Sequence, residues 1–305
     1  MILKDIQILF ISGHDSMNKY MVVVFFLIFH SVAQADTIAF PDPGGVSLFK
    51  TYIRYGKDDI NGLKKSDNPV DNYILGHLYF IGSEQLGIPK NNDEALKFLS
   101  EAWRGDVIDS GFDLALIYYS YGKVKDFDKS RSYMLDSGDG GYVKSQRTLA
   151  RAYAGEVLEN AFSVDRKKSI EWYEKAARNG DQDSADYLSF AYRNGSLVNE
   201  DPKSSFYWRE VASKSKYGQQ ELFSFRILAK YYEKGYGTSK NLVESYKYYD
   251  LSGTGGTEGK KRVAKNMTDA EIQQAIKQSR AWQEEHNTFV PSYYGLEHQT
   301  DGSYR

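Results

Sequence analysis

The 305-residue sequence contains no cysteine and only 6 prolines. It has almost no net charge, because 39 Lys and Arg residues are balanced by 41 Asp and Glu residues. The absence of cysteine excludes disulfides, thiolate metal sites, a cysteine nucleophile and lipidation of an N-terminal cysteine. A formal charge of −2 argues against a general nucleic-acid-binding protein, which usually carries a basic excess. Few prolines together with 15% aromatic residues favour stacked helices over a turn-rich β fold.

Histidine is also scarce, and the familiar catalytic motifs are missing. The sequence has no H-E-x-x-H, no G-x-S-x-G and no phosphate-binding glycine loop after a strand. Beyond residue 35 the histidines are His77, His286 and His298, and none is four residues from another. We therefore expect no enzyme, no cofactor and no bound metal. A cell-wall hydrolase is the weak catalytic alternative, and it would need a cleft carboxylate with a raised pKa.

An apolar segment near the start of the chain has the layout of a secretory signal peptide. Met17 is followed by Lys19, by nine apolar residues at 21–29, and by Ala33 and Ala35 at the two positions that signal peptidase reads. Nine apolar residues are too few to cross a bilayer, which takes about 20. We expect translation to start at Met17 and cleavage after Ala35, which leaves no membrane anchor. Residues 1–16 would be an upstream extension and residues 36–46 a leader; an uncleaved anchor is the alternative.

A short pattern recurs at steps of 35 to 40 residues. Each copy has a Leu, a small residue directly after it and a Tyr four positions after the Leu; a second segment has a small residue three positions before an aromatic one. These spacings place the side chains on one face of a helix, so each copy predicts a helix pair, A and B. One pair cannot cover its own apolar face, and stacked pairs can. The A tyrosines are Tyr79, Tyr118, Tyr153, Tyr192 and Tyr232, and the B aromatics are Phe98, Tyr133, Trp172, Trp208 and Tyr248.

These residues resemble the Sel1-like repeat family, which is related to the tetratricopeptide repeats. The stretch VDRKKSIEWYEKAARNG, residues 164–180, is similar to the second half of the family pattern, with Asp165, Trp172 and Gly180 in place. The resemblance covers about residues 47–287, although repeat two is degenerate and Ser often replaces Ala. It implies an all-α fold, a right-handed α/α superhelical solenoid of about five Sel1-like helix pairs with N- and C-terminal capping helices.

The expected domain boundaries follow from the repeats. We expect an N-terminal half-repeat cap at 47–70, five repeats at 71–256, C-terminal capping helices at 257–287 and a flexible tail at 288–305. Thr268 and Glu271 form a capping box that predicts the start of the closing helix. The last junction between repeats has four additional residues, which predicts a longer helix or a kink near Tyr217–Glu221. The A helices are expected to start at Asp71, Ser110, Ser145, Ser184 and Ser224.

The resemblance implies a non-catalytic scaffold that binds other proteins. Exported bacterial members of the family are linked to host interaction, envelope assembly or neutralisation of a toxic effector, and the fold alone does not choose among these roles. Together with the signal peptide, this predicts a periplasmic or secreted protein-binding scaffold. Neutralisation of a cognate toxin is a special case, and a structural or assembly scaffold of the envelope is the alternative.

The candidate partner surface is the A-helix face opposite the core, on the concave side of the solenoid. Repeats one and two place mostly aromatic residues there, and repeats three to five place mostly cations beside Asp186 and Glu233. Aromatic residues and Arg dominate interface energetics, so this pattern suits a protein partner with an acidic segment. The alternative is that neighbouring A helices bury the aromatic residues. The candidate residues are Tyr73, His77, Phe80, Phe112, Leu116, Tyr119, Arg147, Arg151, Phe190, Arg193, Arg226, Lys230 and Glu233.

Overall fold

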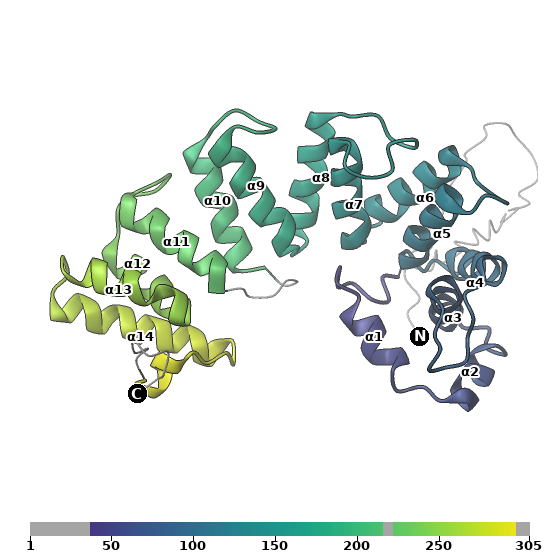
Figure 1. Cartoon of the computed structure of the whole chain (residues 1–305), viewed down its shortest axis with the longest axis horizontal. Coiled ribbons are helices and arrows are strands. Elements are labelled where there is room, and N and C mark those ends of the chain that lie inside the picture. Colours follow the sequence, from purple (N-terminus) through teal and green to yellow (C-terminus); the bar gives the residue numbers. More distant parts are fainter. Residues whose placement is uncertain (1–36, 216–221, 297–305) are drawn as a thin grey trace, which may run out of the picture. The chain divides into compact units, whose positions relative to one another are not determined.

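The computed structural model describes residues 37–215 and 222–296, and both the signal segment 1–35 and the predicted kink at Tyr217–Glu221 lie outside these ranges. Within them the regular structure is helical, apart from the isolated bridges Thr37–Val107 and Ser83–Ile88. The all-α prediction is confirmed (Figure 1). The elements are α1 (Val46–Tyr52), α2 (Lys57–Leu63), α3 (Pro69–Ile81), α4 (Asn92–Arg104), α5 (Asp109–Ser120), α6 (Phe127–Asp139), α7 (Val143–Ala154), α8 (Arg166–Arg178), α9 (Gln182–Asn194), α10 (Pro202–Ser213), α11 (Leu222–Lys234), α12 (Leu242–Leu251), the 3₁₀ turn η1 (Gly253–Gly256), α13 (Thr257–Ala264), α14 (Asp269–Glu285) and the 3₁₀ turn η2 (Pro291–Tyr294).

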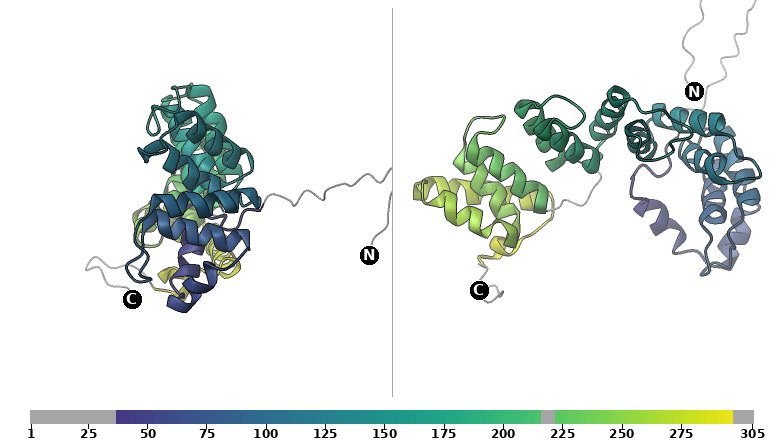
Figure 2. Two further views of the ribbon diagram at one scale, coloured as in Figure 1. Left: turned by 90° about the vertical axis from the view of Figure 1, so that its right-hand side faces the viewer. Right: turned by 45° about the horizontal axis from the view of Figure 1, so that its top comes forward.

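Five consecutive helix pairs form the body of the fold, and Figure 2 shows their succession from two further sides. The odd-numbered helices α3 to α11 are the A helices, and each starts one or two residues before the position expected from the sequence. The even-numbered helices α4 to α12 are the B helices. Each B helix begins after an Asp or Asn whose side chain accepts backbone N–H groups of the first turn, as N-cap residues do. These caps are Asn91, Asp126, Asp165, Asp201 and Asn241.

The residues of the repeat pattern form the contacts within each pair. The A leucines are completely buried. In repeat one the Tyr79 ring stacks on Phe98 with centroids 5.9 Å apart, and Tyr232 stacks on Tyr248 in repeat five at 5.8 Å. Such ring pairs add stabilisation beyond the apolar area that they bury. The predicted meeting of A tyrosine and B aromatic is therefore confirmed at both ends of the repeat series.

Small residues at the A–B contact allow the two backbones to approach closely. A Cβ atom on Gly76 would lie 2.7 Å from Leu99 Cγ and 2.9 Å from the Leu99 backbone nitrogen. In repeat four the contact is made by two serines, because Ser189 and Ser205 each donate a hydroxyl hydrogen bond of 2.8 Å to the other's carbonyl oxygen. The hydroxyl groups of Ser189 and Ser205 therefore bond across the pair, which offsets the cost of burying these two polar groups.

The N-terminal segment, residues 37–45, lies in the range that was expected to be a short leader, and it makes hydrogen bonds and apolar contacts within the folded body. Thr37 donates to Asp106 O at 2.8 Å and accepts from Ile108 N at 3.0 Å. Ala39 and Phe40 donate their backbone N–H groups to the Asp109 carboxylate, and the Phe40 ring is buried. The segment has no periodic pattern, so its packing could not be predicted from the sequence. Backbone hydrogen bonds, the Asp109 carboxylate and the apolar contacts of Ile38, Ala39 and Phe40 hold it.

The two ends of the repeat series are covered by short helices. At the N-terminal end, α1 and α2 bury Leu48, Ile60 and Leu63, as the predicted half-repeat requires. At the C-terminal end, α14 starts with the predicted capping box, since Glu271 N donates to Thr268 Oγ1 and Thr268 N donates to Glu271 Oε2.

The first part of the expected flexible tail packs on α14. Val290 is buried, and its backbone nitrogen donates to Gln283 Oε1 at 2.8 Å. The Tyr293 hydroxyl donates to Glu284 Oε1. These contacts hold residues 288–296 on the closing helix, while residues 297–305 lie outside the described part of the chain.

Candidate partner-binding surface

Two aromatic residues of the candidate surface are buried within the fold. The exposed fraction is 2% for Tyr73 and 8% for Phe112. The ring of Phe40, from the N-terminal segment, lies 5.8 Å from Tyr73, and Tyr142 packs edge-on against Phe112 at 6.1 Å. Burial raises the pKa of Tyr73 well above its usual value. Tyr73 and Phe112 thus belong to the core, and rings from outside the A helices, those of Phe40 and Tyr142, contribute to covering them.

The other residues of repeats one and two are half-buried and lie at the edge of this packing. His77 Nδ1 is 2.7 Å from Asp113 Oδ2, and the Asp113 side chain is almost completely buried. Tyr119 packs on Phe127 with ring centroids 5.4 Å apart. Leu116 and Phe80 are partly exposed. None of the six predicted residues in repeats one and two is therefore fully exposed: two are buried and four are half-buried.

Arg147 connects two repeats. Its guanidinium bonds to Asp181 at 3.2 Å and also contacts Asp183, both at the start of α9. The Asp181 side chain is 1% exposed, and burial raises its pKa while Arg147 and the Ser184 hydroxyl oppose that shift. A buried carboxylate needs such a partner. Arg147 is therefore committed to the repeat junction.

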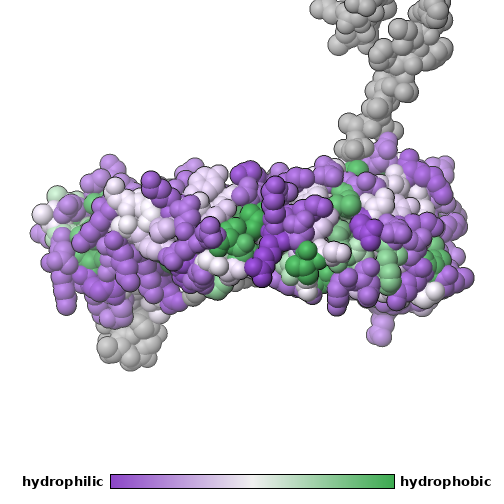
Figure 3. Space-filling view, turned by 90° about the horizontal axis from the view of Figure 1, so that it is seen from above, coloured by the Kyte–Doolittle hydropathy of each residue, from purple (hydrophilic) through white to green (hydrophobic). Residues whose placement is uncertain are grey.

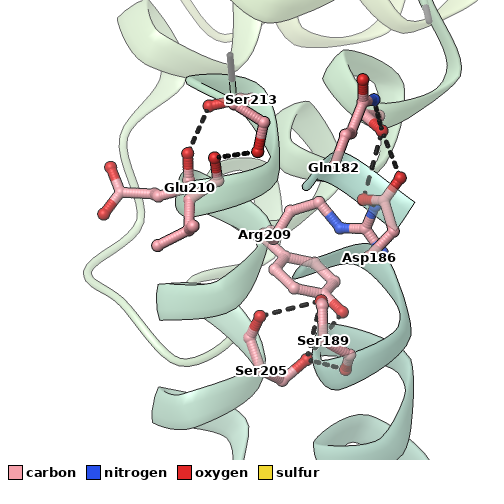
Figure 4. A network of polar contacts seen from close by, with 11 residues as sticks. Gln182, Asp186, Ser189, Ser205, Arg209, Glu210 and Ser213 are labelled. Carbon is pink, nitrogen blue, oxygen red and sulfur yellow. Dashed lines mark hydrogen bonds and ion pairs between the residues drawn. The ribbon is translucent and has the colours of Figure 1, made fainter. Parts of the chain in front are cut away.

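The predicted acid Asp186 is also paired inside the fold. Arg209, on α10, is buried and forms an ion pair with Asp186, on α9 (Figure 4). Ser224 at the start of α11 donates to Asp186 Oδ2 at 2.9 Å, and Gln182 donates to Ser224. Burial lowers the pKa of the Arg209 guanidinium despite the neighbouring carboxylate. This network ties three successive helices together across the last repeat junction.

Glu233, the second acid of the candidate surface, is held by the C-terminal cap. Arg262 on α13 makes two hydrogen bonds to its carboxylate, at 2.7 and 2.8 Å, and the Tyr249 hydroxyl donates a third at 2.6 Å. The hydrogen bonds from Arg262 lower the pKa of Glu233. Both acids that diluted the predicted positive charge are therefore neutralised by arginines outside the predicted set.

Three predicted residues remain exposed at the same position of three successive A helices. These are Arg151 on α7, Phe190 on α9 and Lys230 on α11, called here the exposed strip. The Phe190 side chain is 48% exposed, and the Arg193 guanidinium lies 5.6 Å from its ring centroid. Arg151 is paired with Glu156 at 3.0 Å on the surface. Arg226, also in the predicted set, is half-buried and has its own interactions.

Phe190 is one of several large apolar side chains that are exposed among the described residues, and Phe49 and Tyr207 are exposed to a similar extent. Figure 3 shows one side of the molecule, where the surface is mostly hydrophilic and the hydrophobic areas are small and separate. A half-exposed aromatic ring beside a cation, as Phe190 is beside Arg193, is of a residue type that anchors protein interfaces. Over residues 37–215 and 222–296, no helix is long and apolar enough to cross a bilayer, and no cluster of three His, Asp or Glu side chains is placed to hold a metal ion.

Sequence reasoning missed the partners of the surface residues. One signal was available in the sequence: Asp109 and Asp113 lie four residues apart in an otherwise apolar helix. Carboxylates buried in such a helix require hydrogen-bond donors from other parts of the chain. Asp109 bonds to the N-terminal segment and Asp113 to His77. The ion pairs of Arg209 and Arg262 could not be predicted, because in the sequence these residues do not differ from solvent-exposed arginines on other helices.

The repeat geometry agrees with comparisons to known proteins. The family model for the Sel1 repeat matches four segments, residues 70–104, 148–181, 183–215 and 226–256. The helix pair α5 and α6 lies between the first two matches, where the sequence is degenerate. No curated protein sequence matches the chain. Sel1 repeats mediate protein–protein interactions, and proteins built from them are typically non-catalytic scaffolds.

Solved structures with the same fold include the following two. One is a protective antigen present in uropathogenic Escherichia coli strains, with 21% identity and a TM-score of 0.51 over 78% of this chain and 50% of that one. The chain thus spans half the length of that antigen. The other is a Sel1 repeat protein from Oxalobacter formigenes, with 19% identity and a TM-score of 0.51 over 85% of this chain and 94% of that one. With the matched repeats and the five helix pairs, the chain is a member of the Sel1-like repeat family.

Proposed function

We propose that the mature chain is an exported, non-catalytic scaffold that binds a protein partner across the exposed strip of Arg151, Phe190 and Lys230. The observation that carries the proposal is the half-exposed Phe190 ring. It has the Arg193 guanidinium 5.6 Å from its centroid, and it occupies the same helix position as the exposed cations Arg151 on α7 and Lys230 on α11. An exposed aromatic ring gains most from burial against a partner.

The charges around the strip support a partner that brings carboxylates. The surface pair Arg151–Glu156 contributes little to stability, so exchanging Glu156 for a partner's carboxylate has a low cost. Arg147, Asp186 and Glu233 are committed to internal pairs, so the acidic preference rests on the strip and on Arg193 alone. The proposed contact is smaller than the full A-helix face.

Export is the second part of the proposal and rests on the signal-peptide pattern at residues 17–35. Cleavage after Ala35 would leave Asp36 ahead of Thr37, whose N–H and C=O are both hydrogen bonded within the fold. Mass spectrometry of the protein recovered from the cell envelope or medium should find a chain that starts at Asp36. A chain that retains residues 17–35 would contradict export by cleavage.

The surface is tested by capture of partners from envelope extracts with the wild-type chain and with the variants Phe190→Ala and Lys230→Glu. Both variants should lose most of the captured partner with the melting temperature almost unchanged, because both side chains are exposed. Tyr207→Ala is the matched control, since Tyr207 on the B helix α10 is 49% exposed. Equal capture by Phe190→Ala and wild type would refute the strip as the binding surface.

The identity of the captured protein separates the roles within this proposal. One stoichiometric toxic effector would support a neutraliser, since a bound scaffold can block an active site. Several wall-associated proteins would instead support the structural or assembly role in the envelope.

A further inference from the structure

A pocket of about 390 Å³ lies between the N-terminal segment, α1, α3 and the start of α7. It is separate from the exposed strip. Its walls include the rings of Phe40, Phe49 and Tyr52, and its polar lining includes His77 and Lys144. A volume in this range accommodates a large side chain and some neighbouring backbone.

The polar groups of the pocket are suited to an anion. No Asp or Glu is among the residues that line it. The ammonium group of Lys144 lies 4.5 Å from the Phe112 ring centroid, and among the described residues no carboxylate is within 4.0 Å of it. His77 Nδ1 is engaged with Asp113 Oδ2 at 2.7 Å, which leaves Nε2 as the ring nitrogen available to a ligand. A carboxylate placed here would meet the Lys144 ammonium group and lie beside the Nε2 edge of His77.

The rim of the pocket exposes apolar surface. The exposed fraction is 52% for Val46 and 50% for Phe49, both on the seven-residue helix α1. Exposed apolar side chains beside a pocket are typical of a surface that a partner covers. Because the exposed area continues along α1, the ligand extends beyond one residue.

We infer that this pocket binds a peptide segment of the protein partner in which an apolar side chain is adjacent to an Asp or Glu. The apolar side chain lies among Phe40, Phe49 and Tyr52, and the carboxylate meets Lys144 and His77. The inference rests on the proposed scaffold function and adds a second contact, at the opposite end of the repeat series from Lys230.

A displayed library of internal seven-residue peptides, selected against the purified chain, tests the chemistry directly. Selection should enrich sequences with an aromatic or large aliphatic residue next to Asp or Glu. A synthetic copy of a selected peptide, acetylated and amidated at its ends, should bind at least threefold more weakly when its acidic residue is changed to Gln or Asn. Selected sequences without an acidic residue, or equal binding of the copy in which Gln or Asn replaces the acidic residue, would overturn the inference.

Variants of the chain then locate the binding site. Gly44 lines the pocket, has no left-handed backbone, and has only one atom, Val46 Cγ2 at 3.7 Å, near a built Cβ. Gly44→Phe should therefore fill the pocket without strain and abolish peptide binding, and Lys144→Gln should weaken binding at least threefold. Gly122→Phe is the matched control, because a Cβ on Gly122 meets nothing within 4 Å.

Peptide binding that survives Gly44→Phe would overturn the assignment of this pocket. The Phe190→Ala variant should bind the peptide normally, since its side chain lies on α9, away from the residues that line the pocket. Loss of partner capture in Phe190→Ala, combined with an absence of peptide binding to the wild type, would leave the proposed function intact and remove only the pocket.

Discussion

The Asp109 carboxylate accepts the backbone N–H of Phe40 at 2.9 Å and that of Ala39 at 2.8 Å, across about seventy residues of sequence. Asp109 is fully buried at the start of α5. Two backbone donors on one buried carboxylate fix the N-terminal segment against the turn between the first two repeats. This contact also brings Phe40 to Tyr73 and shapes the pocket.

Asp109 should make the stability of the chain depend on pH. Burial raises its pKa to about 6 in spite of the two backbone hydrogen bonds. Because the folded state binds the proton more tightly than the unfolded state, this group's stabilising contribution is full below its unfolded pKa of about 4 and is lost as the pH rises through about 6. The unfolding free energy should therefore contain a component, on the order of 3 kcal/mol, that grows on acidification across this window.

Denaturant unfolding at several pH values, with the wild type and Asp109→Asn, isolates this component. The difference between the two curves should be steep between pH 6 and 4 and flat above pH 7. Asp181, whose pKa is also raised, contributes equally to both proteins and cancels in the difference. Parallel curves would show that Asp109 does not titrate in this range.

The close contact between α3 and α4 predicts opposite effects for two helical glycines. Gly76→Ala should destabilise the chain by about 1–3 kcal/mol, because its Cβ meets the backbone of Leu99 and overpacking has costs of this size. Gly62→Ala on α2 is the control; a Cβ there meets nothing within 4 Å, so the better helix propensity of Ala should stabilise by up to about 1 kcal/mol. Thermal or chemical unfolding measures both changes, and a neutral Gly76→Ala would refute the tight approach.

The ion pair between Arg209 and Asp186 predicts an asymmetric response to mutation. Asp186→Ala leaves a buried guanidinium without its carboxylate and should destabilise by about 3–5 kcal/mol. Arg209→Met leaves a carboxylate that is partly exposed and bonded to Ser224, so the loss should be smaller. The double variant should be more stable than Asp186→Ala alone. Equal losses of stability in the two single variants would contradict the interpretation that Arg209 is buried while Asp186 is partly exposed.

Two arginines on α7 should differ although both are paired with acids. Arg147→Gln removes the cation beside the buried Asp181 and should destabilise by about 1–3 kcal/mol. Arg151→Gln removes an exposed pair with Glu156 and should change the unfolding free energy by less than about 1 kcal/mol. Comparable effects of the two substitutions in chemical unfolding would show that Arg147 is as free for a partner as Arg151.

The repeat pattern predicted the helix pairs because spacing within a helix reports directly on which residues share a face. The stacked rings of Tyr79 and Phe98 and the close approach at Gly76 follow from local sequence. Repeat two forms its pair even though the family model does not match it. Gly138, where the family pattern has Ala, is needed there because a Cβ would lie 2.5 Å from Leu149 Cδ1.

The candidate surface was less predictable, because a helix face shows what points outward but not what covers it. The burial of Tyr73 depends on Phe40, from a segment without periodic pattern. The charge of the surface depends on long side chains that reach from other helices, such as Arg262 to Glu233. Only Phe190 and its two cationic counterparts kept the exposure that the helix periodicity predicts.

The N-terminal segment also changes how the array comes apart. The outermost unit of a repeat protein normally frays first, because it has a neighbour on one side only. Here Thr37 is bonded to the turn beyond α4 while Phe40 covers α3, so the first repeat is clamped from outside by its own preceding chain. Local unfolding at this end must therefore break the contacts of residues 37–40 with both α3 and the start of α5. The first repeat should unfold more cooperatively than a terminal repeat without such a segment.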